Sequence, residues 1–251
     1  MHRCDCALNG ASLSALDPRI RVTDVIETSP RCRIQTADHP LAGMFLLRRS
    51  RQSLGVQVRF LLQEGDVVRR RALMQKVLAW AERGGTLTTS DRPGQQLRVL
   101  CASSPAVSAL SWLDELTIEF RAYQTPFWEA VSPVSVTTAD TADLTVPGTA
   151  AEAPVTAEVV NTGDAPLTTL TLAAGHTCLR FEGLNLPASS AFRLDFADGL
   201  LTAAIDGVSV LPCRTADSDD LLLAPCSQTC EVSVSADQPV QASFWARGRY
   251  L

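Results

Sequence analysis

The side chains best suited to metal or nucleophilic chemistry are three histidines and eight cysteines, and their spacing decides what they could do. They are His2, His39 and His176, and Cys4, Cys6, Cys32, Cys101, Cys178, Cys213, Cys226 and Cys230. No histidine has a second histidine or a carboxylate at ligand spacing, and Cys4-x-Cys6 and Cys226-x3-Cys230 are the only close cysteine pairs. Structural zinc sites combine two such pairs, or a short Cys/His set. The sequence therefore predicts no metal site, no cofactor and no histidine-based catalytic centre.

The cysteines raise a second question, the redox state. Eight cysteines in a short secreted chain would form a disulfide framework. The first residues, Met-His-Arg-Cys-Asp-Cys, contain no apolar segment typical of a signal peptide. We therefore expect folding in the cytoplasm and eight free thiols.

Acidic residues are the remaining candidates for chemistry. The densest cluster, Asp217, Asp219 and Asp220, lacks the glycine and the later glutamate of a calcium loop. A glycosidase needs paired carboxylates, but aspartates near turns have a simpler explanation in β-rich chains; these are Asp195, Asp198 and Asp206. Neither G-x-S-x-G, H-E-x-x-H, a P-loop nor a dinucleotide-binding motif occurs. The sequence predicts that this protein is not an enzyme.

Tryptophans offer a different chemistry, stacking on sugars. Trp112, Trp128 and Trp245 are the candidates. Phe244 and Trp245 are adjacent on one expected strand, so if Phe244 is core, Trp245 faces solvent or a partner. The pair Phe127-Trp128 follows the end of a strand at a proline. We interpret that pair as a joint between two domains, with a sugar shelf or core packing as alternatives.

Charge divides the chain in two. Residues 1–125 contain 17 basic and 12 acidic side chains, net +5, whereas residues 126–251 contain 5 and 15, net −10. Lys76 is the only lysine. The arginines are scattered and accompany no nucleic-acid motif. The reversal of sign near Phe127 predicts domains at 1–128 and 129–251.

The first half alternates apolar and polar residues over six expected strands, including 19–27, 43–49 and 54–63. Residues 48–53, with Arg48, Arg49 and Arg51, read as a short hairpin-like connection. A helix is expected at about 66–83, capped by Asp66 and ended by Gly84-Gly85. Leu73, Val77 and Trp80 form its apolar stripe.

From residue 131 onward the sequence pattern changes to short expected strands separated by turn residues. Expected strands are 131–138, 155–160, 168–173, 177–182, 190–196, 201–206, 220–223, 229–235 and 239–248. This spacing indicates an antiparallel β-sandwich. The fold class expected for the whole chain is mainly β (α+β), with one amphipathic helix.

The order of these features resembles the distal tail protein family of long-tailed phages and prophages. The resemblance rests on "LNG" (8–10), "IRVTDVIE" (20–27), "GVQVRFLLQEGDVVRRRALMQKVLAWA" (55–81), "LTTSDRPGQQLRVLCASSP" (87–105), "LTIEFRAYQTPFWE" (116–129) and "RGRYL" (247–251). It implies a β-barrel-like or sandwich-like first domain that forms a hexameric ring around a channel for DNA, and a galectin-like second domain outside it. Many members carry a long arm or belt in the first domain, whereas residues 48–53 are short.

The resemblance also implies partners and a location. The ring would join the tail tube protein to the tail-tip hub in the virion, after assembly in the host cytoplasm, with no membrane insertion. Receptor-binding proteins or host glycans are further possible partners, and DNA would only pass through. Because arginine meets carboxylates bidentately, we expect Arg48, Arg49, Arg51, Arg69 and Arg70 at subunit contacts, with Glu64, Asp66, Asp114 and Glu115 as acceptors. The alternative function is a carbohydrate-binding module or adhesin.

Overall fold

The computed structural model describes residues 4–28, 32–39, 43–103, 113–197, 200–223 and 229–251. The chain forms two compact units, Met1–Trp128 and Glu129–Leu251. It passes from the first to the second within β10 (Trp128–Ala130). In the described residues, no helix is both long and apolar enough to cross a membrane.

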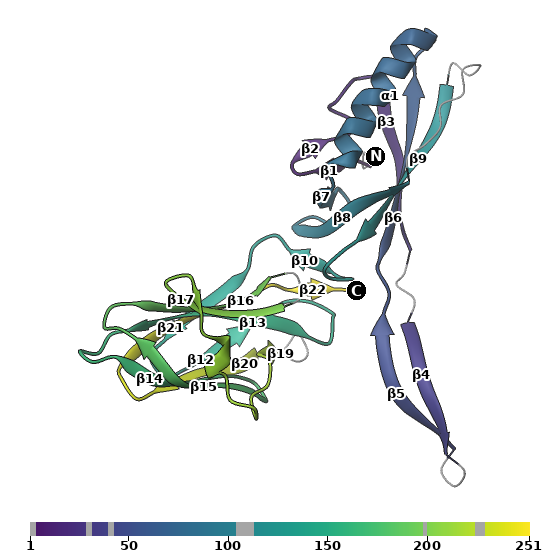
Figure 1. Cartoon of the computed structure of the whole chain (residues 1–251). Helices are drawn as coiled ribbons and strands as arrows, with labels where there is room; N and C mark the ends of the chain where they lie inside the picture. Colours follow the sequence, from purple (N-terminus) through teal and green to yellow (C-terminus); the bar gives the residue numbers. More distant parts are fainter. Residues whose placement is uncertain (1–3, 29–31, 40–42, 104–112, 198–199, 224–228) are drawn as a thin grey trace. The chain divides into compact units, whose positions relative to one another are not determined.

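An antiparallel sheet is the main element of the first unit (Figure 1). Seven of its strands follow the order β2-β1-β7-β8-β9-β6-β3. Their bounds are β1 Cys6–Leu8, β2 Ala11–Ser12, β3 Ile20–Thr28, β6 Gly55–Gln63, β7 Gly85–Thr89, β8 Gln95–Ser103 and β9 Leu113–Ala122. Alternation decides which face is buried: Val56, Val58 and Phe60 of β6 are each at most 1% exposed, and the residues between them face outward.

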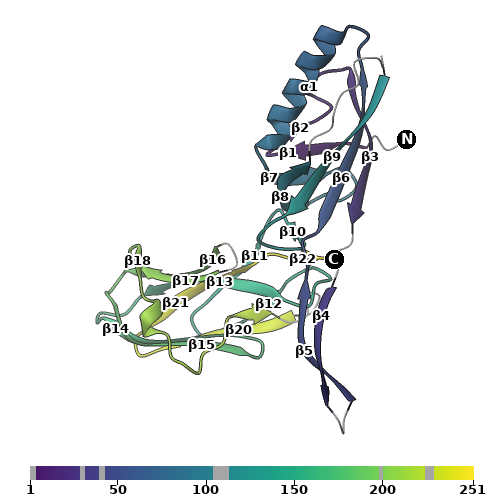
Figure 2. The same cartoon turned by 45° about the vertical axis from the view of Figure 1, so that its right-hand side comes forward.

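Helix α1 (Val67–Glu82) covers the apolar face of this sheet (Figure 2). Asp66 caps it by accepting a hydrogen bond from the Arg69 backbone N–H at 2.9 Å. Gly84, with φ of +55°, follows its end. Trp80 packs edge-on against Phe120 with ring centroids 6.0 Å apart, so the predicted stripe is the buried one. Helix, cap and end agree with the sequence prediction.

The predicted connection at 48–53 is wrong. Arg48, Arg49 and Arg51 lie inside β5 (Gly43–Arg51), which pairs with β4 (Cys32–His39) in a separate two-stranded sheet. Thr28, the last residue of β3, pairs with Gly55, the first of β6, and Cys32, the first residue of β4, pairs with Arg51, the last of β5. The two strands therefore leave the main sheet together and continue as a hairpin, which we call the arm (residues 32–51). The short connection read from residues 48–53 had suggested a departure from the arm-bearing members of that family, and the strand at 32–39 that completes this hairpin was not among the expected strands.

The second unit is an antiparallel sandwich, as predicted. One sheet has the order β11-β21-β13-β16-β17-β18, with β19 beside β13, and the other is β12-β20-β14-β15. The bounds are β11 Val134–Thr138, β12 Thr141–Thr145, β13 Ala153–Asn161, β14 Leu167–Ala174, β15 Thr177–Leu186, β16 Ala191–Ala197, β17 Leu200–Ile205, β18 Val208–Ser209, β19 Leu222–Leu223, β20 Thr229–Ala236, β21 Val240–Ala246 and β22 Arg249–Tyr250, with a 3₁₀ turn η1 at Leu211–Cys213. One apolar core joins the sheets. Phe181 of β15 meets Phe192 of β16 edge-on at 5.0 Å.

Candidate interaction surfaces

The structure assembles no group suited to catalysis from the candidates that it describes. No three His, Cys, Asp or Glu side chains among the described residues are grouped as a metal site. Six cysteines, at positions 4, 6, 101, 178, 213 and 230, are not part of a disulfide bond. Cys32, Cys226, His2, His39, Asp198 and Trp112 fall outside what the structure describes in side-chain detail. Asp217 and Asp220 form ion pairs with Arg180 and Arg214, in keeping with a solvated loop.

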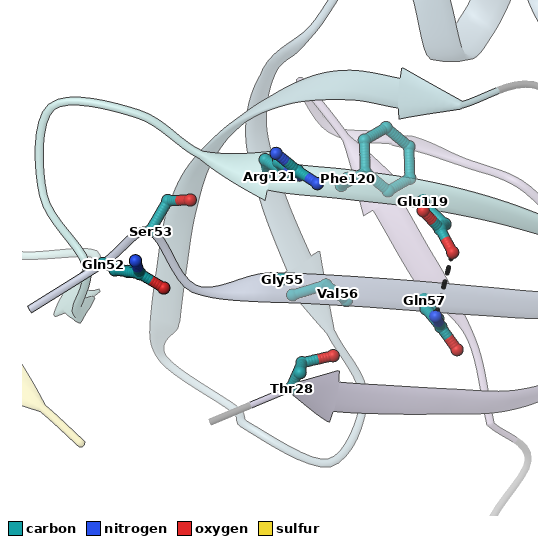
Figure 3. Close-up of a pocket in the computed structure, with 9 residues that line it drawn as sticks. All are labelled: Thr28, Gln52, Ser53, Gly55, Val56, Gln57, Glu119, Phe120 and Arg121. Carbon is teal, nitrogen blue, oxygen red and sulfur yellow. Dashed lines mark hydrogen bonds between the residues drawn. The ribbon is translucent and has the colours of Figure 1, made fainter. Parts of the chain in front are cut away.

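A pocket of about 700 Å³ opens at the root of the arm (Figure 3). It is lined by Thr28, by Gln52 and Ser53 between β5 and β6, and by residues of β6 (Gly55, Val56, Gln57) and β9 (Glu119, Phe120, Arg121). Gln57 donates a hydrogen bond to Glu119 across its wall at 3.0 Å. The lining mixes polar side chains with the core residues Val56 and Phe120, which is compatible with a contact surface.

The arm exposes apolar side chains. Ile34 is 59% exposed, Met44 68% and Leu47 67%. Large apolar groups on an isolated two-stranded hairpin gain nothing in water, and such hairpins are only marginally stable by themselves. The arm therefore has the properties of an element that another surface covers.

The five arginines expected at subunit contacts separate into three cases. Arg48, Arg49 and Arg51 belong to the arm, where the structure describes their backbone but not their side chains. Arg69 is exposed at the first turn of α1. Arg70 does not fit the expectation, because it is 2% exposed and its guanidinium donates to the carbonyls of Glu64 and Gly65 at 2.9 and 3.4 Å.

Two of the expected acceptors are already occupied within the chain. Glu64 forms an ion pair with Arg19, and its pKa is lowered by hydrogen bonding to the Asp66 backbone and by that arginine. The Asp66 carboxylate caps α1, and the Arg69 N–H lowers its pKa. Glu115 is exposed, and the Asp114 side chain is outside the described residues. Only Arg69 and Glu115 therefore remain, among described side chains, as candidates for pairing across subunits.

Trp128 is completely buried, which excludes it as a sugar shelf. The Arg92 guanidinium lies 5.3 Å from its ring centroid, and Arg92 also binds both oxygens of Glu27 at 2.5 and 2.9 Å. The indole N–H of Trp128 and the Thr125 hydroxyl are buried without a hydrogen-bond partner. Arg92 therefore connects Glu27, near the end of β3, to Trp128, the last residue of the first unit.

Trp245 has a different environment. Phe244 is fully buried in the sandwich core, and Trp245 points to the opposite face, where it is half-buried. Its neighbours across the strands are Ser135 and Thr156. The alternation predicted from the sequence is therefore correct.

Comparison with known proteins gives structural matches alone. No family model and no curated protein matches the sequence. The SPP1 Dit (gp 19.1) protein, described as a paradigm of hub adsorption apparatus in phages that infect Gram-positive bacteria, superposes with a TM-score of 0.73 at 14% identity, over 97% of this chain and 98% of that one. A chain of the phage p2 baseplate in its activated conformation with strontium gives 0.50 at 8% identity, over 97% of both chains. At these identities the likeness establishes the fold, and the mainly β fold expected from the resemblance to distal tail proteins is confirmed.

Proposed function

We propose that this chain is a structural protein of a phage tail tip. It forms a ring, a hexamer in the simplest case, that joins the tail tube to the tail-tip hub, with DNA passing through the channel. The observation that carries the proposal is the match to SPP1 Dit over 97% of the chain, which spans both units. The described residues contain no group of His, Cys, Asp and Glu side chains that could hold a metal ion, which is compatible with this role.

The arm supplies a physical reason for self-assembly. Its three exposed apolar side chains and its lack of a supporting sheet favour binding to a surface of another copy. Burying one such side chain contributes about 1.5–3 kcal/mol, so three contribute enough to order a hairpin at a contact. Arg48, Arg49 and Arg51 on β5 would add pairs to carboxylates of the neighbour.

The test is to replace the exposed apolar residues of the arm. The variant Ile34→Ser/Met44→Ser/Leu47→Ser should fold, because substitutions at exposed positions change stability by only about 0.5 kcal/mol. Light scattering should show the parent as an oligomer and the variant as a smaller species.

The matched control is Leu200→Ser/Val208→Ser, since both residues are 69% exposed but lie on the second unit. It should assemble like the parent. An arm variant that assembles normally would remove the arm from the mechanism, and a parent that is monomeric at all concentrations would refute the ring.

The second unit supports an additional role, binding host glycans. Trp245, with hydroxyls of Ser135 and Thr156 beside it, presents an aromatic ring with flanking hydrogen-bonding groups. Trp245→Ala should abolish binding to cell-wall polysaccharide fragments in a glycan array without changing assembly. No binding by the parent would reject this role and leave the structural role untouched.

A further inference from the structure

Helix α1 presents a face that the first unit does not use. The buried side is centred on Val77, and at 100° per residue the opposite side carries Val68, Ala72, Gln75 and Ala79, with Glu82 at its edge beside Gln75. Val68 is 76% exposed. A helix that faced only water would be expected to carry charged residues there.

A line of cations runs beside this ridge. Arg69, Lys76 and Arg83 are seven residues apart, so they repeat about every 10.5 Å along the same side. All three are exposed. The charges nearest to them within the chain are Glu64 and Asp66 for Arg69 and Asp17 for Lys76, and these carboxylates already accept hydrogen bonds from Arg19 or from the backbone of α1. The first turn of α1 contains no acidic residue, so Arg69 opposes the helix dipole. We call this surface the basic helix face (Val68, Arg69, Ala72, Lys76, Ala79 and Arg83).

The opposite electrostatic imbalance occurs on the second unit. Asp143 of β12 lies directly across from Glu231 of β20, and both are exposed on the outside of the four-stranded sheet. Like charges in this position repel each other. Neither carboxylate forms an ion pair with a described residue.

The second unit cannot neutralise this pair from its own residues. Its net charge is −10, and it has five arginines. Each is already engaged: Arg180, Arg193, Arg214 and Arg249 form ion pairs, with Asp217, Glu158, Asp220 and Glu129, and Arg247 donates to the carbonyls of Ala130 and Val131. No arginine of the second unit is therefore left to pair with Asp143 and Glu231.

We propose that the basic helix face of one copy docks on the Asp143–Glu231 face of a second copy. Arg69, Lys76 and Arg83 supply the missing cations, and the short side chains of Val68, Ala72 and Ala79 allow the helix to approach closely. A second copy is the occupant because each chain carries both halves of the charge complement, so that identical copies can pair through these two surfaces. This contact involves other residues than the arm, so the proposal can be tested independently of the proposed ring.

Sedimentation velocity at several protein concentrations, in 50 and 500 mM salt, tests the proposal. Charge pairs weaken as the Debye length falls, so the association constant of the parent should drop at least tenfold at the higher salt. Arg69→Glu/Lys76→Glu/Arg83→Glu should abolish this salt-dependent association, and the Gln triple variant should weaken it. The control Arg21→Glu/Arg59→Glu/Arg98→Glu makes the same change in net charge at exposed residues of β3, β6 and β8, and should associate like the parent.

Charge exchange identifies the partner surface. Asp143→Lys/Glu231→Lys should also lose the association, and combining it with the glutamate helix variant should restore it. Equal loss in the helix variant and its control would mean that only net charge matters, and would overturn the proposal. A salt-dependent change in the sedimentation coefficient that does not vary with protein concentration would also overturn the proposal, because it would indicate a contact within one chain. If the helix-face variants associate like the parent but the arm variant still gives smaller species, this proposal is wrong and the proposed ring is unaffected.

Discussion

Replacing Trp128 separates the contribution of its ring from that of its N–H group. The ring is completely buried, with the Arg92 guanidinium 5.3 Å from its centroid. Trp128→Ala should therefore destabilise the first unit by about 3–5 kcal/mol, the usual effect of truncating a buried aromatic residue. Loss of the cation–π contact accounts for about 0.5–2 kcal/mol of that.

Trp128→Phe should behave very differently. Phenylalanine loses apolar contact worth about 1 kcal/mol, but it also removes an N–H that is buried without an acceptor. An unsatisfied buried donor costs about 1–3 kcal/mol. The Phe variant should therefore be as stable as the parent within about 1 kcal/mol, or more stable.

The assay is urea unfolding followed by far-UV circular dichroism at helical wavelengths. Among described residues the α-helix belongs to the first unit, so this signal reports on that unit even if the second unfolds separately. With a slope of about 2 kcal/mol per molar, the Ala variant should shift the midpoint by about 1.5–2.5 M. Equal destabilisation by Ala and Phe would refute the reasoning, because the indole N–H must then have a partner.

Three further predictions concern the first unit. Hydrogen bonds from Arg19 lower the pKa of Asp17 to about 2. The ionised Asp17 therefore stabilises the folded protein above its unfolded pKa of about 3.9, and this stabilisation is lost as pH falls through about 2. Asp17→Asn should lower the free energy of unfolding at pH 7 but not near pH 2, as urea titrations at each pH would show. Asp66→Ala should lower the melting temperature of the first unit, followed by the helical circular dichroism signal, because the Arg69 N–H loses its acceptor. Asp66→Asn keeps an acceptor at the same position and should keep the cap. Equal melting temperatures of the two variants would contradict the capping role. All eight thiols should react under denaturing, non-reducing conditions, and fewer than eight would indicate a disulfide. In the native protein Cys6 should react slowest, because its side chain is 2% exposed and burial raises its pKa.

The sequence was sufficient where local signals and burial agreed. Asp66 and Gly84 mark the ends of α1, and alternation over one buried face identified β6. The strand β4 is hard to predict for a physical reason: a hairpin outside the main sheet has no buried face, so the apolar–polar alternation of residues 32–35 does not continue through residues 36–39. Likewise β12 buries only Leu144 completely, which leaves little pattern to detect.

The candidate interface residues were harder to predict, because burial depends on contacts distant in sequence. Arg70 follows Arg69 and is chemically identical, yet the turn of the helix places it against the Glu64 and Gly65 carbonyls. Trp128 was recognised as a ring that something must cover, but the Arg92–Glu27 pair beside it comes from two other strands and their turns. Its role at the joint between two domains remains a proposal.

Native mass spectrometry of the purified full-length chain tests the central claim most directly. The proposal predicts one closed oligomer, six copies of the 27.0 kDa chain in the simplest case, with no ladder of larger or smaller species. The Ile34→Ser/Met44→Ser/Leu47→Ser variant should break it into smaller species. A parent that remains monomeric up to the highest accessible concentration, or an open-ended series of oligomers, would contradict a ring-forming tail protein.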